Sequence, residues 1–332
     1  MENHEFTLVL SESDVSSLLS SEAAYAASEE AFRLVGSGKM TVTHQPALFC
    51  DSDCRNMFGS MCVHWPEKKI MGMKWFNMFS HQQPGYPAMN GHVIILSNTE
   101  NGAPVTILAG TPVTNYRTAA GHGTVAAKTF ARKGASSLAV IGCGSQGELG
   151  LFSIAASLPI KRIFLWSRNL KKAEALADRA AAAYPAMEIT VADTPAAAVR
   201  QADIVLTATS ARVPLLHGKD IPPGCTVIGL YSFNDLSVDL AEELDLWMLG
   251  HGEADRKSIL ENRKLLERGA VPDPSLVAGD LSSVLCGRIP GRTSESQRIL
   301  YTHMGMAALD VTLAARIYEG AVSKGMGLRL HF

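Results

Sequence analysis

The chain has 332 residues, of which 47% are hydrophobic and 19% are charged, and its formal net charge is -2 at pH 7. This is the composition of a globular protein with room for two domains. The chain has no basic field that would hold a polyanion, so nucleic acid is disfavoured as a partner. No apolar stretch approaches the roughly 20 residues of a membrane span. The acidic N-terminal residues do not resemble a signal peptide, and we therefore expect a cytoplasmic protein with no membrane partner.

The six cysteines are too sparse for a disulfide framework. Cys50 and Cys54 form a C-x3-C pair, but no second pair stands at metal-ligand spacing. We therefore expect reduced thiols and no metal site.

The first third of the chain predicts a helix followed by a sheet. Apolar residues recur at helical intervals over residues 11–35, which begin with Ser11 and Asp14 at capping-box spacing. Short apolar runs separated by turn clusters follow over residues 40–110 and favour an antiparallel or mixed sheet. The alanine-rich residues 114–133 predict another helix.

From residue 136 onward, predicted strands alternate with predicted helices, a pattern typical of a parallel, doubly wound sheet. The chain from Ser296 onward is interpreted as mainly one long helix that returns to the first domain. The predicted fold class is therefore α/β, with a Rossmann sheet inserted in a smaller α+β domain for substrate binding and dimerisation. We expect the smaller domain at residues 1–115 plus 300–332, and the nucleotide-binding domain at residues 116–299.

A glycine-rich turn follows the first strand of this alternating region. Its glycines stand at G-x-G-x-x-G spacing and open a helix, which is the context of a dinucleotide-binding turn. The first glycine allows the tight turn, the second allows close approach of a pyrophosphate, and the third allows the helix to pack on the strand. The expected cofactor contacts at this turn are Gly142, Gly144, Ser145, Gln146 and Gly147.

The end of the second strand indicates which dinucleotide binds. NAD enzymes usually place a carboxylate there, which would repel a 2′-phosphate. This chain has Ser167 and Arg168 instead, and the guanidinium of an arginine matches a phosphate well. We therefore favour NADP(H), with NAD(H) as the alternative. Thr207, Ala208 and Thr209, at the end of a later strand, are also expected to contact the cofactor.

Four motifs together resemble the ornithine cyclodeaminase/mu-crystallin family, and the resemblance covers essentially the whole chain. They are KWFN, TNYRTAAGHG, VIGCGSQG and GRTSESQRILYTHMGMAALD. The resemblance implies a homodimer that binds NAD(H) or NADP(H) and uses its N-terminal sheet domain for substrate and dimerisation. It also implies hydride transfer at the α-carbon of an amino acid by way of an imine, with the nicotinamide performing the difficult step.

The resemblance further implies that Lys74 and Arg117 grip the substrate α-carboxylate. An arginine suits a planar carboxylate through bidentate geometry. Lys74 follows an apolar stretch and precedes Trp75 and Phe76, so desolvation is expected to lower its pKa toward the working pH and to suit it to proton transfer.

Two places depart from the family pattern. Where the family commonly has a further arginine, this chain has His44 or Gln45. Where the cyclodeaminases have an aspartate for the side-chain amine of the substrate, this chain has Phe233, with Asp235 two residues later. An apolar ring cannot hold an ammonium group, so this departure disfavours cyclisation of ornithine or lysine.

We therefore expect an NAD(P)H-dependent imine or ketimine reductase, or an amino-acid dehydrogenase. The alternatives are an ornithine- or lysine-type cyclodeaminase, which releases ammonia, and a non-catalytic NADPH-dependent binder of small molecules similar to mu-crystallin.

Overall fold

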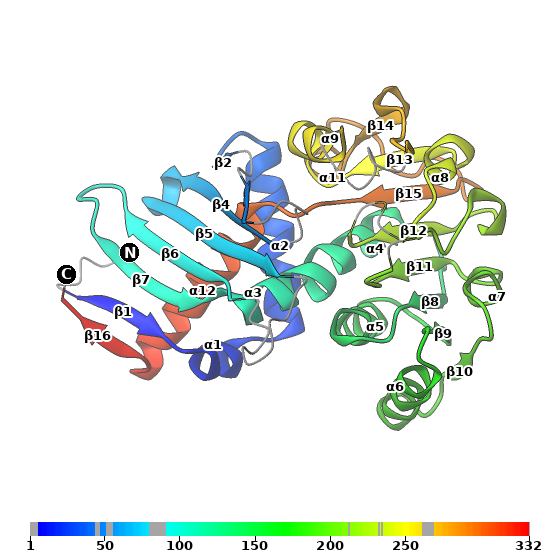
Figure 1. Cartoon of the computed structure of the whole chain (residues 1–332), viewed down its shortest axis with the longest axis horizontal. Helices are drawn as coiled ribbons and strands as arrows, with labels where there is room; N and C mark the ends of the chain where they lie inside the picture. Colours follow the sequence, from blue (N-terminus) through cyan, green and yellow to red (C-terminus); the bar gives the residue numbers. More distant parts are fainter. Residues whose placement is uncertain are drawn as a thin grey trace. The chain divides into compact units, whose positions relative to one another are not determined.

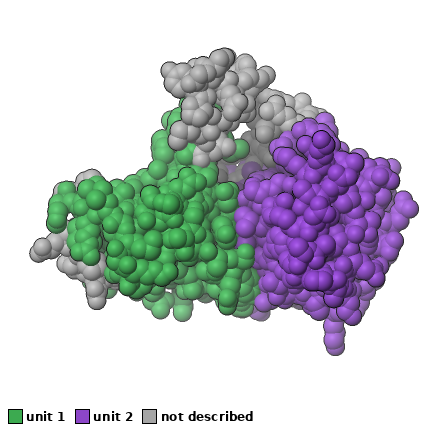
Figure 2. Space-filling view, turned by 90° about the horizontal axis from the view of Figure 1, so that it is seen from below, with its two compact units in different colours: residues 1–117, 306–332 green, residues 118–305 purple. Residues whose placement is uncertain are grey.

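The computed structural model describes residues 6–43, 47–50, 56–79, 91–211, 213–231, 233, 235–260 and 269–331. Contacts divide the chain into two compact units, which Figure 2 shows in different colours. Unit 1 comprises Met1–Arg117 and Met306–Phe332, and unit 2 comprises Thr118–Gly305. Each unit is built on its own sheet (Figure 1). In the described part of the chain, no helix is long and apolar enough to cross a membrane.

The sheet of unit 1 is mixed, as the sequence predicts. Its strands lie in the order β16-β1-β7-β6-β5-β4-β2, and β3 pairs with β4 off this path. The pairing of β1 with β7 is parallel, and the other pairings are antiparallel. The strands are β1 (Thr7–Leu10), β2 (Thr41–Val42), β3 (Ala47–Phe49), β4 (Asn56–Trp65), β5 (Ile70–Phe79), β6 (Val93–Asn98), β7 (Pro104–Ala109) and β16 (Leu328–Leu330).

In unit 1, two helices of 7 and 16 residues occupy the stretch where the sequence predicts a single helix. The predicted capping box is present, because Ser11 and Asp14 satisfy each other's backbone N–H groups at the start of the first helix. Ser20 then caps a second helix by accepting a hydrogen bond from the Ala23 N–H at 3.1 Å. The elements are α1 (Glu12–Leu18), α2 (Ser21–Gly36), η1 (Pro66–Lys68), α3 (Gly110–Tyr116) and α12 (Ala307–Lys324).

Helix α12 lies against the sheet of unit 1, with α2 beside it (Figure 1). Gly72 on β5 permits the close approach, because a β-carbon at this position would lie 2.8 Å from Cγ1 of Val311 on α12. Lys74 is on the same face of β5 as Gly72, and Asp310 precedes Val311 on the helix. The absence of a side chain at Gly72 thus allows the helix to approach the strand that carries Lys74.

Unit 2 has a parallel sheet in the order β10-β9-β8-β11-β12-β15-β13-β14, which confirms the doubly wound prediction. The strand order reverses between β8 and β11, the place where such sheets bind ligands at their carboxyl edge. The strands are β8 (Ser137–Ile141), β9 (Arg162–Trp166), β10 (Glu188–Val191), β11 (Ile204–Thr207), β12 (Thr226–Gly229), β13 (Leu246–Leu249), β14 (Val277–Asp280) and β15 (Ile299–Thr302).

The helical segments of unit 2 connect these strands. The predicted helix over residues 114–133 is α3 followed by a π-helical segment and then α4, with the division between units falling after Arg117. The remaining elements are η2 (Arg117–Gly123), α4 (Thr124–Phe130), α5 (Ser145–Ser157), α6 (Leu170–Ala183), α7 (Pro195–Val199), η3 (Gly218–Asp220), α8 (Asp239–Glu243), α9 (Gly252–Leu260), η4 (Pro274–Leu276) and α11 (Leu281–Leu285).

The structure corrects the interpretation of the chain from Ser296 onward. Residues Ile299–Thr302 form β15, which pairs with β12 and β13 and therefore belongs to the sheet of unit 2. The expected domain boundary between residues 299 and 300 falls inside this strand, whereas unit 2 ends at Gly305. All residues of β15 are buried, and a short apolar run of this kind cannot be distinguished from a helix by periodicity alone.

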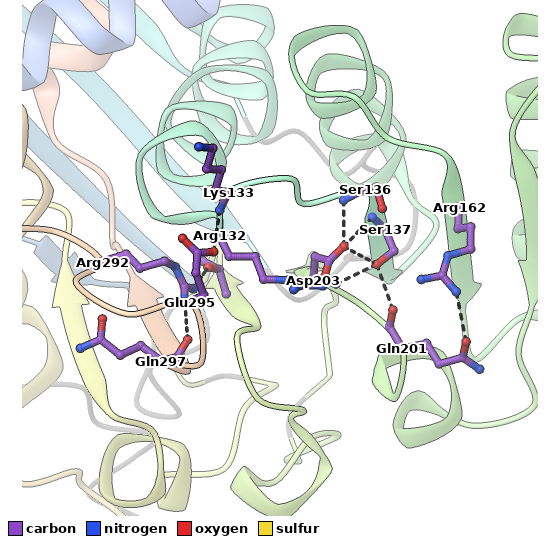
Figure 3. A network of polar contacts seen from close by, with 11 residues as sticks. Arg132, Lys133, Ser136, Ser137, Arg162, Gln201, Asp203, Arg292, Glu295 and Gln297 are labelled. Atoms are coloured by element: carbon purple, nitrogen blue, oxygen red, sulfur yellow. Dashed lines mark hydrogen bonds and ion pairs between the residues drawn. The ribbon is translucent and has the colours of Figure 1, made fainter.

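A polar network joins the amino-terminal ends of β8 and β11 (Figure 3). Asp203, immediately before β11, accepts hydrogen bonds from the backbone N–H groups of Ser136 and Ser137 at 2.8 and 3.0 Å. Arg132 donates to the same carboxylate through Nε at 2.7 Å. These bonds hold the pKa of Asp203 below its usual value, although burial acts in the opposite direction.

The GRT motif belongs to the same end of the sheet. Arg292 donates through Nε to the carbonyl of Phe130 at 2.9 Å and through Nη2 to Oγ1 of Thr226, the first residue of β12, at 3.0 Å. Because ligands of parallel sheets bind at the opposite, carboxyl edge, we assign Arg292 a structural role.

Candidate functional site

The glycine turn has the geometry that the sequence predicts. Gly142 has a φ of +105°, and a β-carbon there would lie 2.5 Å from the carbonyl oxygen of Ala208. A β-carbon on Gly147 would overlap the carbonyl oxygen of Gly142. Gly144, in contrast, faces open space and is the N-cap residue of α5, which it cannot cap with a side chain. The turn therefore fits a phosphate group at the N-terminus of α5, where backbone N–H groups lack intrahelical partners.

The other predicted cofactor contacts gather around this turn. The Gly142 N–H donates to the carbonyl of Trp166 at 2.8 Å, so the end of β9 lies beside the turn, and Ser167 and Arg168 follow directly. The Ala208 N–H donates to the last residue of β8 at 2.8 Å. On α5, Ser145 is exposed and Gln146 is buried.

Asp235 is enclosed by the loop that follows β11. Thr209 donates to its Oδ2 through Oγ1 at 2.8 Å and through the backbone N–H at 3.2 Å, and Thr207 donates to Oδ1 at 3.2 Å. Burial nevertheless raises the pKa of Asp235 above its usual value. Both oxygens of this carboxylate thus already have partners within unit 2.

The structure places Phe233 in the hydrophobic core of unit 2 and not at a substrate surface. Its side chain is fully buried and packs edge to face against Trp247, with 5.2 Å between the ring centroids. The expectation of a substrate contact for Phe233 is corrected accordingly. The other two substrate residues expected from the sequence, His44 and Gln45, lie outside the described residues.

A buried charge cluster in unit 1 brings Lys74 and Arg117 together. Lys74 projects from β5 between Met61 on β4 and Ile94 on β6, and its side chain is only 2% exposed. Its Nζ lies 2.8 Å from Oδ1 of Asp310, and Nε of Arg117 lies 3.3 Å from the same oxygen. Two cations from β5 and the end of α3 therefore converge on one carboxylate from α12.

Burial dominates the electrostatics of the cluster. Burial, reinforced by the nearby Arg117 and opposed by Asp310, lowers the pKa of Lys74 to about 8. Burial and then Lys74 lower the pKa of His92 to about 4, so that imidazole is neutral at pH 7. Burial alone would raise the pKa of Asp310, but Arg117 and Lys74 outweigh it and hold this pKa below its usual value.

The cluster can accept one further anion. At neutral pH it contains two cations, one carboxylate and a neutral imidazole, and therefore carries an excess of one positive charge. Asp310 Oδ2 and His92 Nδ1 are buried and have no hydrogen-bond partner among the described residues, which is unusual inside a protein. A small carboxylate would neutralise the excess positive charge, and additional polar groups on the same molecule would serve as partners for Asp310 Oδ2 and His92 Nδ1.

Sequence reasoning missed Asp310, His92 and Thr114, whose Oγ1 lies 3.4 Å from Oδ1 of Asp310. A signal for Asp310 is present in the sequence, because it is the one charged residue in the run from Ala307 to Ala315. A carboxylate within such an apolar helix needs a partner when it is buried.

A second buried group that sequence reasoning missed lies at the carboxyl edge of the sheet of unit 2. His303 follows β15, and its Nδ1 lies 2.8 Å from Oδ2 of Asp255 on α9. The same carboxylate oxygen accepts the backbone N–H groups of Gly250 and His251, each at 2.9 Å. The ring of His122 lies perpendicular to that of His303, with 5.0 Å between the centroids. Asp255 thereby joins the loops that follow β13 and β15.

Comparison with known proteins gives a consistent family assignment. Residues 5–325 match the ornithine cyclodeaminase/mu-crystallin family. The chain is 27% identical to the alanine dehydrogenase of Archaeoglobus fulgidus, with 98% of each chain covered. It is 29% identical to a Delta(1)-pyrroline-2-carboxylate reductase of Bacillus cereus, with 75% of this chain and 76% of that protein covered.

Solved structures agree with this assignment over nearly the whole chain. An archaeal alanine dehydrogenase dimer with bound NAD superimposes with a TM-score of 0.86 and 25% identity, covering 98% of this chain and 99% of that one. The Delta(1)-pyrroline-2-carboxylate reductase of Thermococcus litoralis, in complex with NADH and L-proline, gives a TM-score of 0.84 at 23% identity, with 97% and 99% covered. The similarity to the Thermococcus litoralis structure establishes that the two proteins share a fold.

Proposed function

The chain belongs to the ornithine cyclodeaminase/mu-crystallin family, and we propose that it is an NAD(P)H-dependent oxidoreductase acting on the C–N bond of an amino or imino acid. It reduces a small α-imino acid or cyclic ketimine by hydride transfer to the α-carbon, or catalyses the reverse oxidation. The observation that carries this proposal is the buried cluster of Lys74, Arg117 and Asp310, with its excess positive charge. The relatives named as alanine dehydrogenase and pyrroline-2-carboxylate reductase support the reaction class.

The proposed cofactor is a nicotinamide dinucleotide, and its pyrophosphate is assigned to the glycine turn at the N-terminus of α5. When bound, the cofactor supplies or accepts the hydride. The NAD and NADH complexes of the structural relatives support this class of cofactor. NADP(H) is preferred in our proposal because Ser167 and the exposed Arg168 follow β9 where a carboxylate would repel a 2′-phosphate.

In the proposed mechanism, the guanidinium of Arg117 and the ammonium of Lys74 hold the substrate carboxylate and thereby orient the adjacent C=N group. Reduction adds a hydride to the α-carbon and requires a proton on the nitrogen. Lys74, with its pKa lowered to about 8, is suited to donate that proton near neutral pH. Because only its protonated form binds an anion or donates a proton, kcat/KM is expected to fall as the pH rises above about 8.

We also propose that the protein is a homodimer formed through the outer face of the sheet in unit 1. Successive residues of β5 point to opposite faces of the sheet. Trp75 therefore lies on the face opposite to that of Lys74, and it is 44% exposed. Trp75 stacks on Phe58 at 5.5 Å between centroids, and the exposed Val93 lies opposite it on β6. An exposed apolar patch on a sheet is typical of a protein interface, and the archaeal alanine dehydrogenase is a dimer.

The test is a panel of substrates assayed with NADH and with NADPH. It includes 2-oxo acids with ammonia or methylamine, cyclic imino acids such as pyrroline-2-carboxylate, and the corresponding amino acids in the oxidative direction. Consumption of reduced nicotinamide with at least one imino acid is the expected result. A cyclodeaminase would instead release ammonia with no net change in the cofactor, and a pure binding protein would turn over none of the panel.

A further inference from the structure

Asp310 is the point on which both substrate-binding cations converge. Its side chain is completely buried on α12, and a single oxygen, Oδ1, contacts Lys74 Nζ at 2.8 Å and Arg117 Nε at 3.3 Å. Thr114 approaches the same oxygen at 3.4 Å. The two cations come from separate elements, so Asp310 is the group that gives them a common position.

Stability alone does not explain this carboxylate. A buried ion pair is often no more stable than apolar residues that fill the same space, because desolvation of the charges offsets their attraction. The neighbours of Asp310 on α12, Leu309 and Val311, are both fully buried, so an apolar residue would suit this helix. The charge arithmetic offers another reason: Asp310 reduces the cluster from two excess positive charges to one, which a single substrate carboxylate then neutralises.

We propose that Asp310 is a positioning residue of the carboxylate clamp: it fixes Lys74 and Arg117 around one oxygen and keeps Lys74 in its ammonium form before the substrate binds. This inference rests on the proposed function of the same site.

The groups around Lys74 determine what loss of Asp310 does to its charge. Arg117 at the end of α3 is a cation, and His92, before β6, is neutral because its pKa is lowered to about 4. Met61 on β4 and Ile94 on β6 are apolar. Asp310 is thus the only carboxylate among the described groups that favours the charged form of Lys74. Removing it leaves burial and Arg117, both of which lower the pKa of Lys74.

The first measurement is the pKa of Lys74 in the full chain labelled with [13Cε]lysine, followed by NMR, with the signal assigned by its loss in Lys74→Met. In wild type we expect a pKa of about 8. In Asp310→Asn, which keeps the shape of the side chain, we expect a pKa lower by about one unit or more. The control is Thr312→Val, a fully buried position on the same helix whose Oγ1 bonds to the carbonyl of Ala27 at 3.0 Å. This control should leave the titration of Lys74 unchanged.

The second measurement is the affinity for pyrrole-2-carboxylate, an unreactive cyclic carboxylate, from pH 6 to pH 9. A lysine with a pKa near 8 is half protonated at pH 8, whereas one with a pKa near 7 is only about a tenth protonated. Asp310→Asn should therefore bind roughly five-fold more weakly than wild type at pH 8 and similarly at pH 6. Recovery at low pH separates a lost charge from a damaged fold.

An unchanged pKa of Lys74 in Asp310→Asn would overturn the proposal, as would a loss of affinity that is equal at every pH or is reproduced by Thr312→Val. Should Asp310→Asn fail to fold, Asp310→Glu provides the test. It keeps the charge but moves the oxygen, so the pKa of Lys74 should stay near 8 while affinity falls at every pH, and wild-type binding by this variant would refute the positioning role.

These results are distinguishable from failure of the proposed function. If wild type reduces no member of the imine panel, the reaction assignment fails, yet the titration still decides whether Asp310 controls the charge of Lys74. If wild type is active and the titration does not move, only the inference about Asp310 fails.

Discussion

Substitution of Arg117 by alanine tests the carboxylate clamp directly. The guanidinium is one of two cations in the buried cluster, and its Nε contacts Asp310 Oδ1 at 3.3 Å. Truncating one partner of a buried, hydrogen-bonded charge pair costs about 2–5 kcal/mol. If that interaction is made with the substrate carboxylate in the transition state, kcat/KM falls roughly 30-fold to several thousand-fold.

The pH profile adds a second, directional expectation. Arg117 is one of the groups that lower the pKa of Lys74 to about 8. Without it, Lys74 stays protonated to higher pH, so the decline of the remaining activity at alkaline pH should begin above about 8 in Arg117→Ala. The variant is thus expected to be slower at every pH but to retain its residual activity further into the alkaline range.

The assay is steady-state imine reduction from pH 6 to pH 10, with cofactor affinity measured by fluorescence titration. Arg316→Ala is the matched control, because Arg316 is an exposed residue of α12 that pairs with Glu30 at 2.7 Å. Cofactor affinity should remain the same in both variants, since the glycine turn lies in unit 2. Near-wild-type kcat/KM in Arg117→Ala, or an alkaline limb that moves to lower pH, would show that Arg117 is not part of the clamp.

Four further predictions follow from other parts of the molecule. Arg168→Ala should lose most of its preference for NADPH over NADH in fluorescence titrations, and equal affinities in wild type would refute that preference. Trp75→Glu should shift the protein from dimer to monomer in analytical ultracentrifugation, whereas an unchanged mass would exclude this face as the interface. Asp203→Asn should lower the free energy of unfolding by about 1–3 kcal/mol at pH 7 without changing kcat. Because the folded pKa of Asp203 is lowered, its contribution is present above the unfolded pKa of about 4 and is lost as the pH falls through the folded value, so denaturation of the two proteins should converge in acid. L-Ornithine should be a poor substrate, because Asp235 is already bonded through both oxygens and Asp310 is paired with two cations, and rapid formation of proline and ammonia from it would contradict this expectation.

The nucleotide-binding unit was largely predictable because its information is local. The strands β8 and β11 are short, fully buried and mainly apolar runs that end at turns. The glycine spacing matches a positive φ at Gly142 and the lack of space for a side chain at Gly147. Buried strands followed by amphipathic helices permit essentially one handedness of connection. The local sequence pattern therefore predicted both the parallel sheet of unit 2 and the edge of that sheet at which the glycine turn lies.

Residues whose role depends on tertiary contacts were harder to predict. The run Ile299–Thr302 is apolar at every position except Thr302, and its partners β12 and β13 are needed to identify it as a strand. Phe233 illustrates the same limit, because alignment with a family position could not reveal that its ring packs against Trp247. Lys74 and Asp310 are 236 residues apart in the chain, and only the fold brings them together.

Asp310 in unit 1 and Asp235 in unit 2 are both buried carboxylates, but their surroundings differ, and the difference bears on the proposed substrate class. Asp310 is the counter-ion of two cations, so a further ammonium group beside it would add repulsion from Lys74 and Arg117. Asp235 is already bonded through both oxygens to Thr207 and Thr209, and its raised pKa makes it a weaker anion than an exposed aspartate. Neither carboxylate offers a ready partner for a distal amine. A substrate with one carboxylate and an uncharged side chain therefore matches the charges of these residues better than a diamino acid does.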